Sequence, residues 1–351
     1  MDADLTRYSC QMALPGFGEA AQNLLQQAKV LVVGAGGLGC PALQYLAAAG
    51  VGTLGIADYD VISLGNLHRQ ILYTPDDVGL KKAVVAYEKL QKQNPLIKII
   101  AHDIKIDSDN VMGLIRAYDI IVDGTDNFET RYLLNDAAVI SGKPLVYGAI
   151  YQYEGQLAVW NAKNKDGSRS PNYRDLYPEV NAAQVPNCAV GGVIPTLAGI
   201  IGCMQANEVI KYITGTGELL AGKVLIFDAQ TLRSRIIKIG DTTKTNITAL
   251  TATSDVPTVT AGELKKGLEQ NIYELVDVRT IQERDLFDIG GRHIPVEEIE
   301  ENLDYFTSET PKVLYCATGK RSAEAVKLIK RKLPNAKVFT LSGGINQETE
   351  F

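Results

Sequence analysis

The chain has 351 residues, of which 46% are hydrophobic and 22% are charged, a composition typical of a soluble globular protein that excludes a mainly disordered chain. This length favours two domains, because single domains usually take about 100–200 residues. The 35 basic and 41 acidic residues give a net charge of −6, which indicates no nucleic-acid-binding surface.

The five cysteines are few, odd in number and widely spaced, and no two of them form a C-x-x-C pair. They predict neither a disulfide framework nor a zinc site. The segment MDADLTRYSC lacks the basic and apolar parts of a secretory signal, and the longest apolar stretch is interrupted by glycines and a proline. These features predict a cytoplasmic protein without a membrane span.

Short apolar runs alternate with longer helical segments over the first 240 residues, a pattern typical of a parallel sheet with crossover helices. KVLVVGAGGLG predicts a strand and a glycine turn, CPALQYLAAAGVG a helix, and TLGIADYDVI a second strand. Further strands are predicted at IKIIAHDI, DIIVDGTD, KPLVYGAI, GQLAVWN and KVLIFDA, with helices near 80–93, 128–141 and 196–213.

The glycine turn satisfies G-x-G-x-x-G with Gly34, Gly36 and Gly39, between a predicted strand and a predicted helix. Free N–H groups and the helix dipole favour a phosphate at such a turn. Asp58 ends the next strand, where a carboxylate can accept hydrogen bonds from ribose hydroxyls. The sequence therefore predicts a nucleotide site, and an NAD-dependent oxidoreductase is one alternative by this spacing alone.

Charged and amide side chains follow the second and fourth predicted strands. A hydride-transfer site gains little from extra cations and carboxylates, whereas a triphosphate with Mg²⁺ needs both. Ligands of α/β folds bind at the carboxyl ends of parallel strands, so the grouping favours ATP over NAD. The residues concerned are Asn66, Arg69, Gln70 and Lys82 after the second strand, and Asp126, Asn127 and Arg131 after the fourth.

Several longer motifs recur in order: RYS, GAGGLGCP, DYDVI followed by NLHRQ, GLKKA, VDGTDNFETRYLLN, and the stretch from PNCAVGGV to GCMQANEVIKYI. Through them, residues 5–240 resemble the MoeB/ThiF/HesA family of ubiquitin-activating-enzyme-like adenylyltransferases. The resemblance implies a Rossmann-like doubly wound sheet and a homodimer. It also implies adenylation, with ATP and Mg²⁺, of the C-terminal glycine of a small ubiquitin-like sulfur carrier of MoaD/ThiS type that ends in Gly-Gly.

The resemblance also implies roles for single residues. Asp58 would hold the ribose and Asp126 would bind Mg²⁺. Arg69 and Lys82 would stabilise the charge that develops when a carboxylate attacks the α-phosphate. The nucleotide-binding residues implied are Gly34, Gly36, Gly37, Gly39, Asp58, Asp60, Asn66, Arg69, Gln70, Lys82, Asp126 and Asn127.

The chain departs from this family at two places. Many relatives bind a structural zinc through two C-x-x-C pairs, but Asn172 and Asp175 occupy the places of the first pair and no cysteine directly follows IIKIGDTTK, so we predict no zinc. The second arginine of the family's RYxRQ segment, thought to reach the partner subunit's ATP, is Cys10 here. A catalytically weakened nucleotide-binding dimer, acting as a binding or regulatory module, therefore remains an alternative.

Cys188 in VPNCAVGG stands where some relatives carry a cysteine that accepts the activated acyl group or forms an acyl disulfide. The start of a helix at this point would favour the thiolate. The alternative is a small core residue beside glycines, as most free cysteines are.

A stretch rich in Thr, Ser and Asp, DTTKTNITALTATSDVPT, predicts a linker over residues 246–256 between domains at 1–245 and 257–351. Beyond it, strands are predicted at YELVDVR, KVLYCAT and KVFTLSG, with a helix at RSAEAVKLIKRKL. The second domain therefore repeats the α/β alternation on a smaller scale.

The strand KVLY delivers Cys316 into the loop CATGKR, which opens into this helix. Backbone N–H groups, Lys320, Arg321 and the helix dipole would stabilise a thiolate or a persulfide there. Residues 257–347 resemble a rhodanese-like sulfurtransferase domain in LVDVRT, ERDLFDIGGRHIPVEEI, YCATGKRSAEA and LSGGI. The resemblance makes Cys316 the persulfide carrier and places Asp277 and Arg279 in a structural motif.

The two resemblances together match MoeZ-type sulfurtransferases. Adenylation makes the carrier's carboxylate reactive, and the persulfide then supplies the sulfur for a thiocarboxylate, as used in molybdopterin or thiamine biosynthesis. The catalytic residues expected are Cys316, Cys188, Arg69, Lys82 and Arg321. A persulfide donor such as a cysteine desulfurase is the further partner expected.

Overall fold

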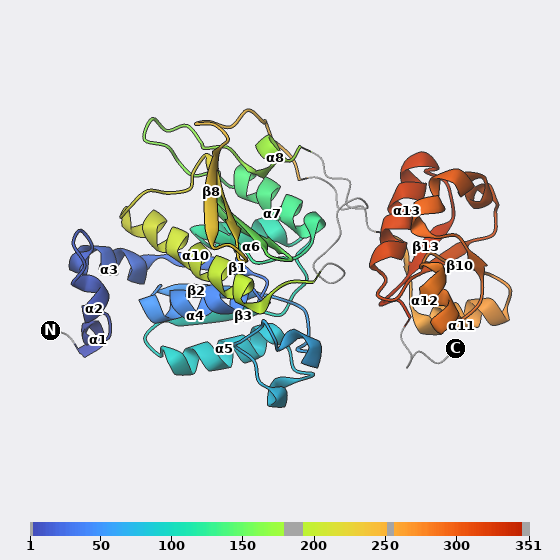
Figure 1. Cartoon of the computed structure of the whole chain (residues 1–351), viewed down its shortest axis with the longest axis horizontal. Coiled ribbons are helices and arrows are strands. Elements are labelled where there is room, and N and C mark those ends of the chain that lie inside the picture. Colours follow the sequence, from blue (N-terminus) through green and yellow to red (C-terminus); the bar gives the residue numbers. More distant parts are fainter. Residues whose placement is uncertain (1–2, 179–191, 251–255, 346–351) are drawn as a thin grey trace. The chain divides into compact units, whose positions relative to one another are not determined.

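The computed structural model of the chain describes residues 3–178, 192–250 and 256–345. The described residues divide into two compact units, one formed by residues 3–178 and 192–250 and the other by residues 256–345. Each unit has its own sheet and its own hydrophobic core (Figure 1).

The first unit is built on an eight-stranded sheet with the strand order β3-β2-β1-β4-β5-β6-β7-β8. The five strands from β3 to β5 in this order pair in parallel, and the order reverses between β1 and β4, which is where open α/β sheets bind ligands. This confirms the predicted α/β class with a Rossmann-like doubly wound sheet. The parallel strands are β1 (Lys29–Val33), β2 (Thr53–Ala57), β3 (Lys98–His102), β4 (Ile120–Asp123) and β5 (Leu145–Tyr151).

The last three strands, β6 (Glu154–Trp160), β7 (Lys223–Asp228) and β8 (Arg233–Lys238), are antiparallel to their neighbours. The sequence pattern did not predict this change of direction. Only two residues separate β5 from β6, and parallel strands need a much longer crossover connection. Strand β8 was not predicted at all, because it is exposed along its whole length and lacks alternating burial.

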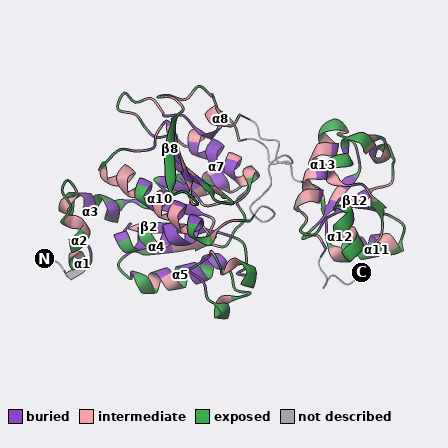
Figure 2. Cartoon of the chain, viewed as in Figure 1, coloured by how far each residue is buried: buried purple, intermediate pink, exposed green. Residues whose placement is uncertain are grey.

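Helices cover both faces of the parallel strands. On β1, Val30 and Val32 belong to one core cluster, whereas Leu31 and Val33 belong to another. The first cluster includes α4 (Gly39–Ala49), α5 (Lys82–Gln93) and α10 (Pro195–Thr214), and the second includes α6 (Val111–Arg116) and α7 (Phe128–Ile140). The buried residues in Figure 2 accordingly gather along the strands and the inner sides of these helices. The remaining helices are α1 (Ala3–Thr6), α2 (Ser9–Met12), α3 (Gly18–Gln27) and α8 (Tyr173–Leu176), with 3₁₀ turns η1 (Leu64–Asn66) and η2 (Pro75–Asp77).

Helix α10 packs closely against the start of α4. A Cβ on Gly202 would come 2.4 Å from the carbonyl oxygen of Leu38, so only glycine permits this approach. From Pro195 on, the apolar stretch of the sequence is therefore a largely buried helix. No helix in the described part of the chain is long and apolar enough to cross a membrane.

The second unit has a parallel five-stranded sheet with the order β11-β10-β12-β13-β9. The three strands and the long helix predicted from the sequence are β10 (Glu274–Asp277), β12 (Lys312–Tyr315), β13 (Val338–Leu341) and α13 (Lys320–Lys332). The elements not predicted are mostly short: β9 (Thr258–Val259), β11 (Arg292–His293), α11 (Ala261–Glu269), α12 (Ile281–Leu286), η4 (Val296–Glu298) and η5 (Glu300–Thr307). This unit is the smaller α/β domain that the sequence predicts.

Candidate functional site

The glycine turn joins β1 to α4 at the carboxyl edge of the parallel strands. Gly34 has φ +93°, and a Cβ there would lie 2.7 Å from the carbonyl oxygen of Gly124, so the turn requires glycine. Within the described residues, the backbone N–H groups of Gly36, Gly37 and Leu38 donate to no acceptor. Three consecutive free N–H groups before a helix form an anion-binding concavity.

Asp58 follows β2 and is nearly buried beside this turn. Its Oδ2 accepts a hydrogen bond from the N–H of Ala35 at 2.7 Å, and its Oδ1 accepts one from the N–H of Asp60 at 2.8 Å. Burial raises the pKa of the Asp58 carboxyl, and the charge of Lys82 and these two N–H groups oppose that shift. The carboxylate is thus fixed against the turn, where the sequence predicts the ribose.

Lys82 begins α5 with only 6% of its side chain exposed. Its Nζ lies 2.9 Å from Oδ2 of Asp60. The hydroxyl of Tyr73 lies 2.9 Å from the carbonyl oxygen of Ala35 and 3.3 Å from that of Lys82, so it links the turn to the start of α5. Sequence reasoning missed Tyr73, whose only signal is a tyrosine shortly after the NLHRQ motif.

Arg69 and Gln70 also lie against the glycine turn. A Cβ on Gly37 would meet Cδ of Arg69 at 3.4 Å, and one on Gly36 would meet Nε2 of Gln70 at 3.5 Å. Only 3% of Gln70 is exposed, and no donor in the described chain reaches its Oε1. An unpartnered buried amide oxygen costs free energy unless a ligand or water satisfies it.

The arginine and asparagine predicted to bind phosphate are less buried than Gln70. Arg69 is half-buried, and its Nη1 lies 2.7 Å from Nε2 of His68. Asn66 is half-buried, and its carbonyl oxygen accepts the N–H groups of Arg69 and Gln70, which closes the turn that presents both side chains. The structure therefore brings the NLHRQ residues together with the glycine turn.

Asp126 and Asn127 follow β4 and are both exposed. Asn127 caps α7, because its Oδ1 accepts the N–H of Thr130 at 2.8 Å. No hydrogen bond or ion pair within the described residues reaches the carboxylate of Asp126. Burial raises the pKa of Tyr59, and the charges of Asp60, Asp126 and Asp58 add to that shift, so these carboxylates face one region.

Magnesium fits this donor set. Such ions are held by one or two carboxylates together with phosphate oxygens, and Asp126 offers a free carboxylate at the strand edge. Among the described side chains, no group of three or more His, Cys, Asp or Glu could hold a metal without such phosphates.

A buried ion pair supports the loop that carries Asp126. Asp123 ends β4 and is fully buried, and Arg131 Nε lies 3.1 Å from its Oδ2. Arg131 also donates to the carbonyl oxygen of Thr125 at 3.0 Å and lies 4.9 Å from the ring of Tyr147. The sequence grouped Arg131 with the charges expected at the nucleotide site, but its side chain is buried and holds the loop in place. Its spacing of eight residues from Asp123 was the available signal.

Zinc does not fit the place where many relatives bind it. Asn172 Nδ2 donates to the hydroxyls of Thr243 at 2.9 Å and Thr245 at 2.6 Å, and the Thr243 hydroxyl donates to Asp175 at 2.7 Å. The backbone N–H of Lys244 donates to the same carboxylate at 2.8 Å. Structural zinc prefers Cys and His ligands. Here a set of hydrogen bonds, the 172–245 polar staple, joins the same two segments.

Cys10 and Cys188 are the other two cysteines singled out from the sequence. Cys10 is exposed on α2, and the neighbouring Arg7 donates to the carbonyl oxygen of Gln93. Cys188 lies outside the described residues, as do Asn181–Pro186 before it. A third, Cys40, is buried in α4, and burial raises its pKa to about 12.

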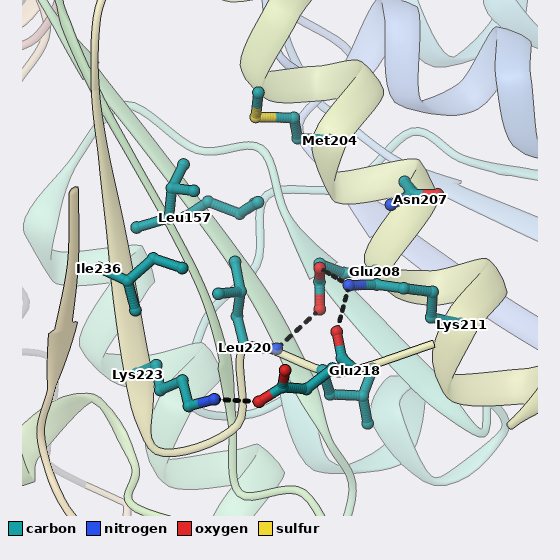
Figure 3. Close-up of a pocket in the computed structure, with 11 residues that line it drawn as sticks. Leu157, Met204, Asn207, Glu208, Lys211, Glu218, Leu220, Lys223 and Ile236 are labelled. Atoms are coloured by element: carbon teal, nitrogen blue, oxygen red, sulfur yellow. Dashed lines mark hydrogen bonds and ion pairs between the residues drawn. The ribbon is translucent and has the colours of Figure 1, made fainter. Parts of the chain in front are cut away.

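A pocket of about 290 Å³ lies between α10 and strands β6, β7 and β8 (Figure 3). Its charged side chains pair with one another: Lys211 contacts Glu208, and Lys223 contacts Glu218. None of the predicted nucleotide-site residues lines it. Because the lining charges compensate each other, this pocket offers no free charge to an ionic ligand.

In the second unit, Cys316 directly follows β12 and is fully buried. The hydroxyl of Ser322 lies 3.6 Å from its Sγ, 3.1 Å from the carbonyl oxygen of Gly319 and 2.7 Å from Oγ1 of Thr340. Ser322 and Thr340 were not predicted from the sequence. The Ser directly after the CATGKR loop was the available signal for one of them.

The loop after Cys316 exposes unused donors. Within the described chain, the N–H groups of Ala317, Thr318 and Gly319 donate to no acceptor, and α13 begins at the next residue. The LSGGI segment closes against this loop: a Cβ on Gly344 would lie 2.4 Å from the carbonyl oxygen of Cys316. The loop therefore has the free N–H groups that stabilise an anionic sulfur.

Arg321 lies in α13 with its guanidinium on the carboxylate of Glu283, at 2.7 and 2.5 Å. This pairing lowers the pKa of Glu283 to about 2. The contribution of the pair to stability is therefore complete above the ordinary carboxyl pKa and is lost only as the pH falls through about 2. Asp277 and Arg279 form a buried ion pair at 2.7 Å, which fits their expected structural role.

The sequence matches the ThiF family over residues 8–249 and the rhodanese-like domain over residues 260–349. A protein of Mycobacterium tuberculosis named a probable adenylyltransferase/sulfurtransferase, MoeZ, is 42% identical over 97% of this chain and 92% of its own length. The sulfur carrier protein adenylyltransferase of Thermus thermophilus is 49% identical over 64% of this chain and 84% of its own length. The adenylyltransferase and sulfurtransferase MOCS3 of Drosophila sechellia is 37% identical over 99% of this chain and 83% of its own length.

Among solved structures, the fold resembles MccB of E. coli, including a form crystallised with ATP. That form has a TM-score of 0.60 and 20% identity, covering 70% of this chain and 75% of MccB. The similarity supports the fold of the first unit. The chain belongs to the ThiF family and carries a C-terminal rhodanese-like domain, the architecture of MoeZ and MOCS3.

Proposed function

We propose that the chain is an adenylyltransferase and sulfurtransferase that activates a ubiquitin-like sulfur carrier with ATP and then delivers sulfur from a persulfide on Cys316. One observation carries the proposal. Each of the two units presents three consecutive free N–H groups before a helix, one set beside Asp58 and Lys82 and the other directly after Cys316. The names of the relatives that share the whole architecture give independent support.

In the adenylation step, the glycine turn would hold the phosphates and Asp58 the ribose. Lys82 and Arg69 supply fixed positive charge beside the turn, where it stabilises the α-phosphate as the carrier's carboxylate attacks and pyrophosphate leaves. Gln70, with its unpartnered oxygen, would bind a donor group of the nucleotide or its water shell. Mg²⁺, when bound through Asp126, neutralises phosphate charge.

In the sulfur-transfer step, the terminal sulfur of the Cys316 persulfide attacks the acyl carbon of the adenylated carrier. AMP leaves, and the carrier is then joined to Cys316 through an acyl disulfide. A second thiol, which we assign to Cys188, cleaves the S–S bond, releasing the thiocarboxylate and leaving a disulfide. The free N–H groups of the loop and the charge of Arg321 favour the anionic sulfur in this sequence.

The expected partners follow from the same proposal: a carrier with a free Gly-Gly end, a persulfide donor such as a cysteine desulfurase, and a second copy of the chain.

The test of the adenylation step is carrier-dependent exchange of pyrophosphate into ATP. We expect Lys82→Ala to lower this exchange by about 100-fold or more, because a preorganised charge is removed.

Lys81→Ala is the matched control, because the neighbouring Lys81 is exposed and pairs with Asp103 at 3.1 Å. It should retain exchange close to the unmodified chain. Equal losses in the two variants, or no exchange with any Gly-Gly carrier although ATP binds, would contradict the proposed adenylation.

The cysteine at position 10, in place of the second arginine of the family's RYxRQ segment, favours one second candidate, a nucleotide-binding dimer with weakened catalysis. Relatives place an arginine there, and arginines that reach a phosphate from a partner subunit contribute about 10³–10⁵-fold in related transfers. If the site is weakened, Cys10→Arg should raise pyrophosphate exchange by orders of magnitude. If it is not, the variant should exchange at the unmodified rate.

A further inference from the structure

Helix α12 of the second unit is held by polar contacts, since none of its residues is buried. Arg279 donates from Nη1 to the carbonyl oxygen of Glu283 at 3.2 Å and from Nη2 to that of Phe287 at 2.7 Å. Arg279 is itself fixed by Asp277, which accepts its Nε at 2.9 Å and its Nη2 at 2.7 Å. The position of α12 therefore depends on charged side chains.

The carboxylate of Glu283, in this helix, is fixed from two sides. Its Oε2 accepts the N–H and the hydroxyl of Thr280, both at 3.1 Å, in a capping box. Its two oxygens also accept Nη1 and Nη2 of Arg321 at 2.7 and 2.5 Å. The cap sets the direction of the carboxylate, and the two parallel bonds then set the plane of the guanidinium.

Arg321 joins this carboxylate to the helix that follows Cys316. It is in the first turn of α13, directly beyond the loop that Cys316 begins. The bond to Glu283 is the main cause that raises the pKa of the Arg321 guanidinium, and the charge of Cys316 and a hydrogen bond to it add to that shift. An arginine without such a clamp would sample many rotamers, because its side chain carries large conformational entropy.

We propose that Glu283 is a positioning residue for sulfur transfer, which holds the Arg321 guanidinium against the Cys316 loop without touching the substrate. The inference rests on the proposed role of Cys316 as the persulfide carrier. Its chemical basis is the charge on the reactants. When thiosulfate is the donor, the Cys316 thiolate attacks the sulfane sulfur, an S–S bond forms to the cysteine, and sulfite leaves with the electron pair of the broken bond. An anion thus approaches an anion, and a fixed cation lowers that barrier.

The test uses the full chain with thiosulfate as sulfur donor and cyanide as acceptor, which returns Cys316 to the thiolate and yields thiocyanate. We expect Glu283→Ala to lower kcat/KM for thiosulfate by about 10-fold or more, since misplacement of a catalytic charge by about 1 Å costs up to about 100-fold. Glu263→Ala is the matched control. Glu263 forms the same kind of capping box with Thr260 in α11 but contacts no arginine in the described chain.

A double-mutant cycle separates positioning from general support of the fold. In an Arg321→Ala background, Glu283→Ala should cause little further loss, because the group that it positions is gone. A second readout is the pH dependence of Cys316 alkylation. Glu283→Gln leaves the charge of Arg321 uncompensated, so the alkylation profile should shift to lower pH.

The possible failures are distinguishable. If Cys316→Ser still produces thiocyanate, the proposed role of Cys316 is wrong. If Cys316→Ser is inactive but Glu283→Ala matches Glu263→Ala, the positioning role is wrong. Equal losses from Glu283→Ala with and without Arg321, together with an unshifted alkylation profile, would show that Glu283 only supports the fold.

Discussion

The two candidate sites differ in which of their polar groups lack a hydrogen-bond or ion-pair partner. In the first unit, Lys82 is paired with Asp60, whereas the carboxylate of Asp126 and the buried Oε1 of Gln70 have no partner among the described residues. In the second unit, the side chains of Arg321 and Ser322 near Cys316 have partners, whereas the backbone N–H groups of the loop are free within the described chain. A bound nucleotide would therefore satisfy side-chain groups, whereas the persulfide sulfur would accept hydrogen bonds from backbone N–H groups.

A substitution of Gln70 tests the role of one of these single side chains. Gln70→Leu should weaken ATP binding by about 10-fold, the equivalent of one lost hydrogen bond of about 1.4 kcal/mol. The melting temperature without ATP should stay the same or rise, because leucine leaves no buried oxygen unpaired. Calorimetric ATP titration and thermal unfolding measure the two effects.

Gln230→Leu, at an exposed position after β7, controls for the change of residue type. It should leave ATP affinity unchanged. A Gln70→Leu variant with normal ATP affinity and a lower melting temperature would mean that Gln70 supports the fold and not the nucleotide.

The elements predicted from the sequence bury an apolar face, although α3, α6 and α11 also bury apolar residues and were missed. The strands from β1 to β7 and helices α4, α5, α7 and α10 follow from apolar periodicity, because burial imposes that period. Elements without a buried face, such as β8 and α12, left no such pattern and were missed. The antiparallel edge was missed because direction depends on connection length and pairing rather than on residue type.

The candidate sites, like the elements, were predicted only in part. Asp58 at the end of β2 and Lys82 at the start of α5 come together because the connections after parallel strands lie at one edge of the sheet. Tyr73 and Glu283 were missed because their roles arise from tertiary contacts with the turn and with Arg321. A local sequence motif does not show which distant residues its side chains contact.

The polar staple gives a prediction at the scale of elements. Asn172 is fully buried and joins α8 to residues 243–245, so Asn172→Ala should cost about 1–3 kcal/mol of unfolding free energy. In a domain of this size, each kcal/mol lowers the melting temperature by about 2–4 °C. Asn207→Ala, at an exposed position on α10, is the control and should change stability little.

Chelation completes this test. Since the staple consists of hydrogen bonds, a strong zinc chelator should leave the melting temperature of the unmodified chain unchanged. A chelator-dependent fall, or an Asn172→Ala variant as stable as Asn207→Ala, would contradict the assignment of the staple.

For the whole molecule, the two units supply complementary halves of one reaction. The first has free N–H groups, carboxylates and a buried lysine at the proposed nucleotide site, and the second has a cysteine at the start of a loop with free N–H groups. The family match covers both units, and relatives of the same architecture are named for both activities. The account therefore requires that a carrier activated by one unit is sulfurated through the other.

The most direct measurement is the mass of a Gly-Gly-terminated carrier after incubation with the full chain, ATP, Mg²⁺ and thiosulfate. The account predicts the exchange of one carrier oxygen for sulfur, dependent on ATP and abolished by Cys316→Ser, while that variant still catalyses pyrophosphate exchange. A thiocarboxylate formed equally well by Cys316→Ser, or formed without ATP, would contradict it.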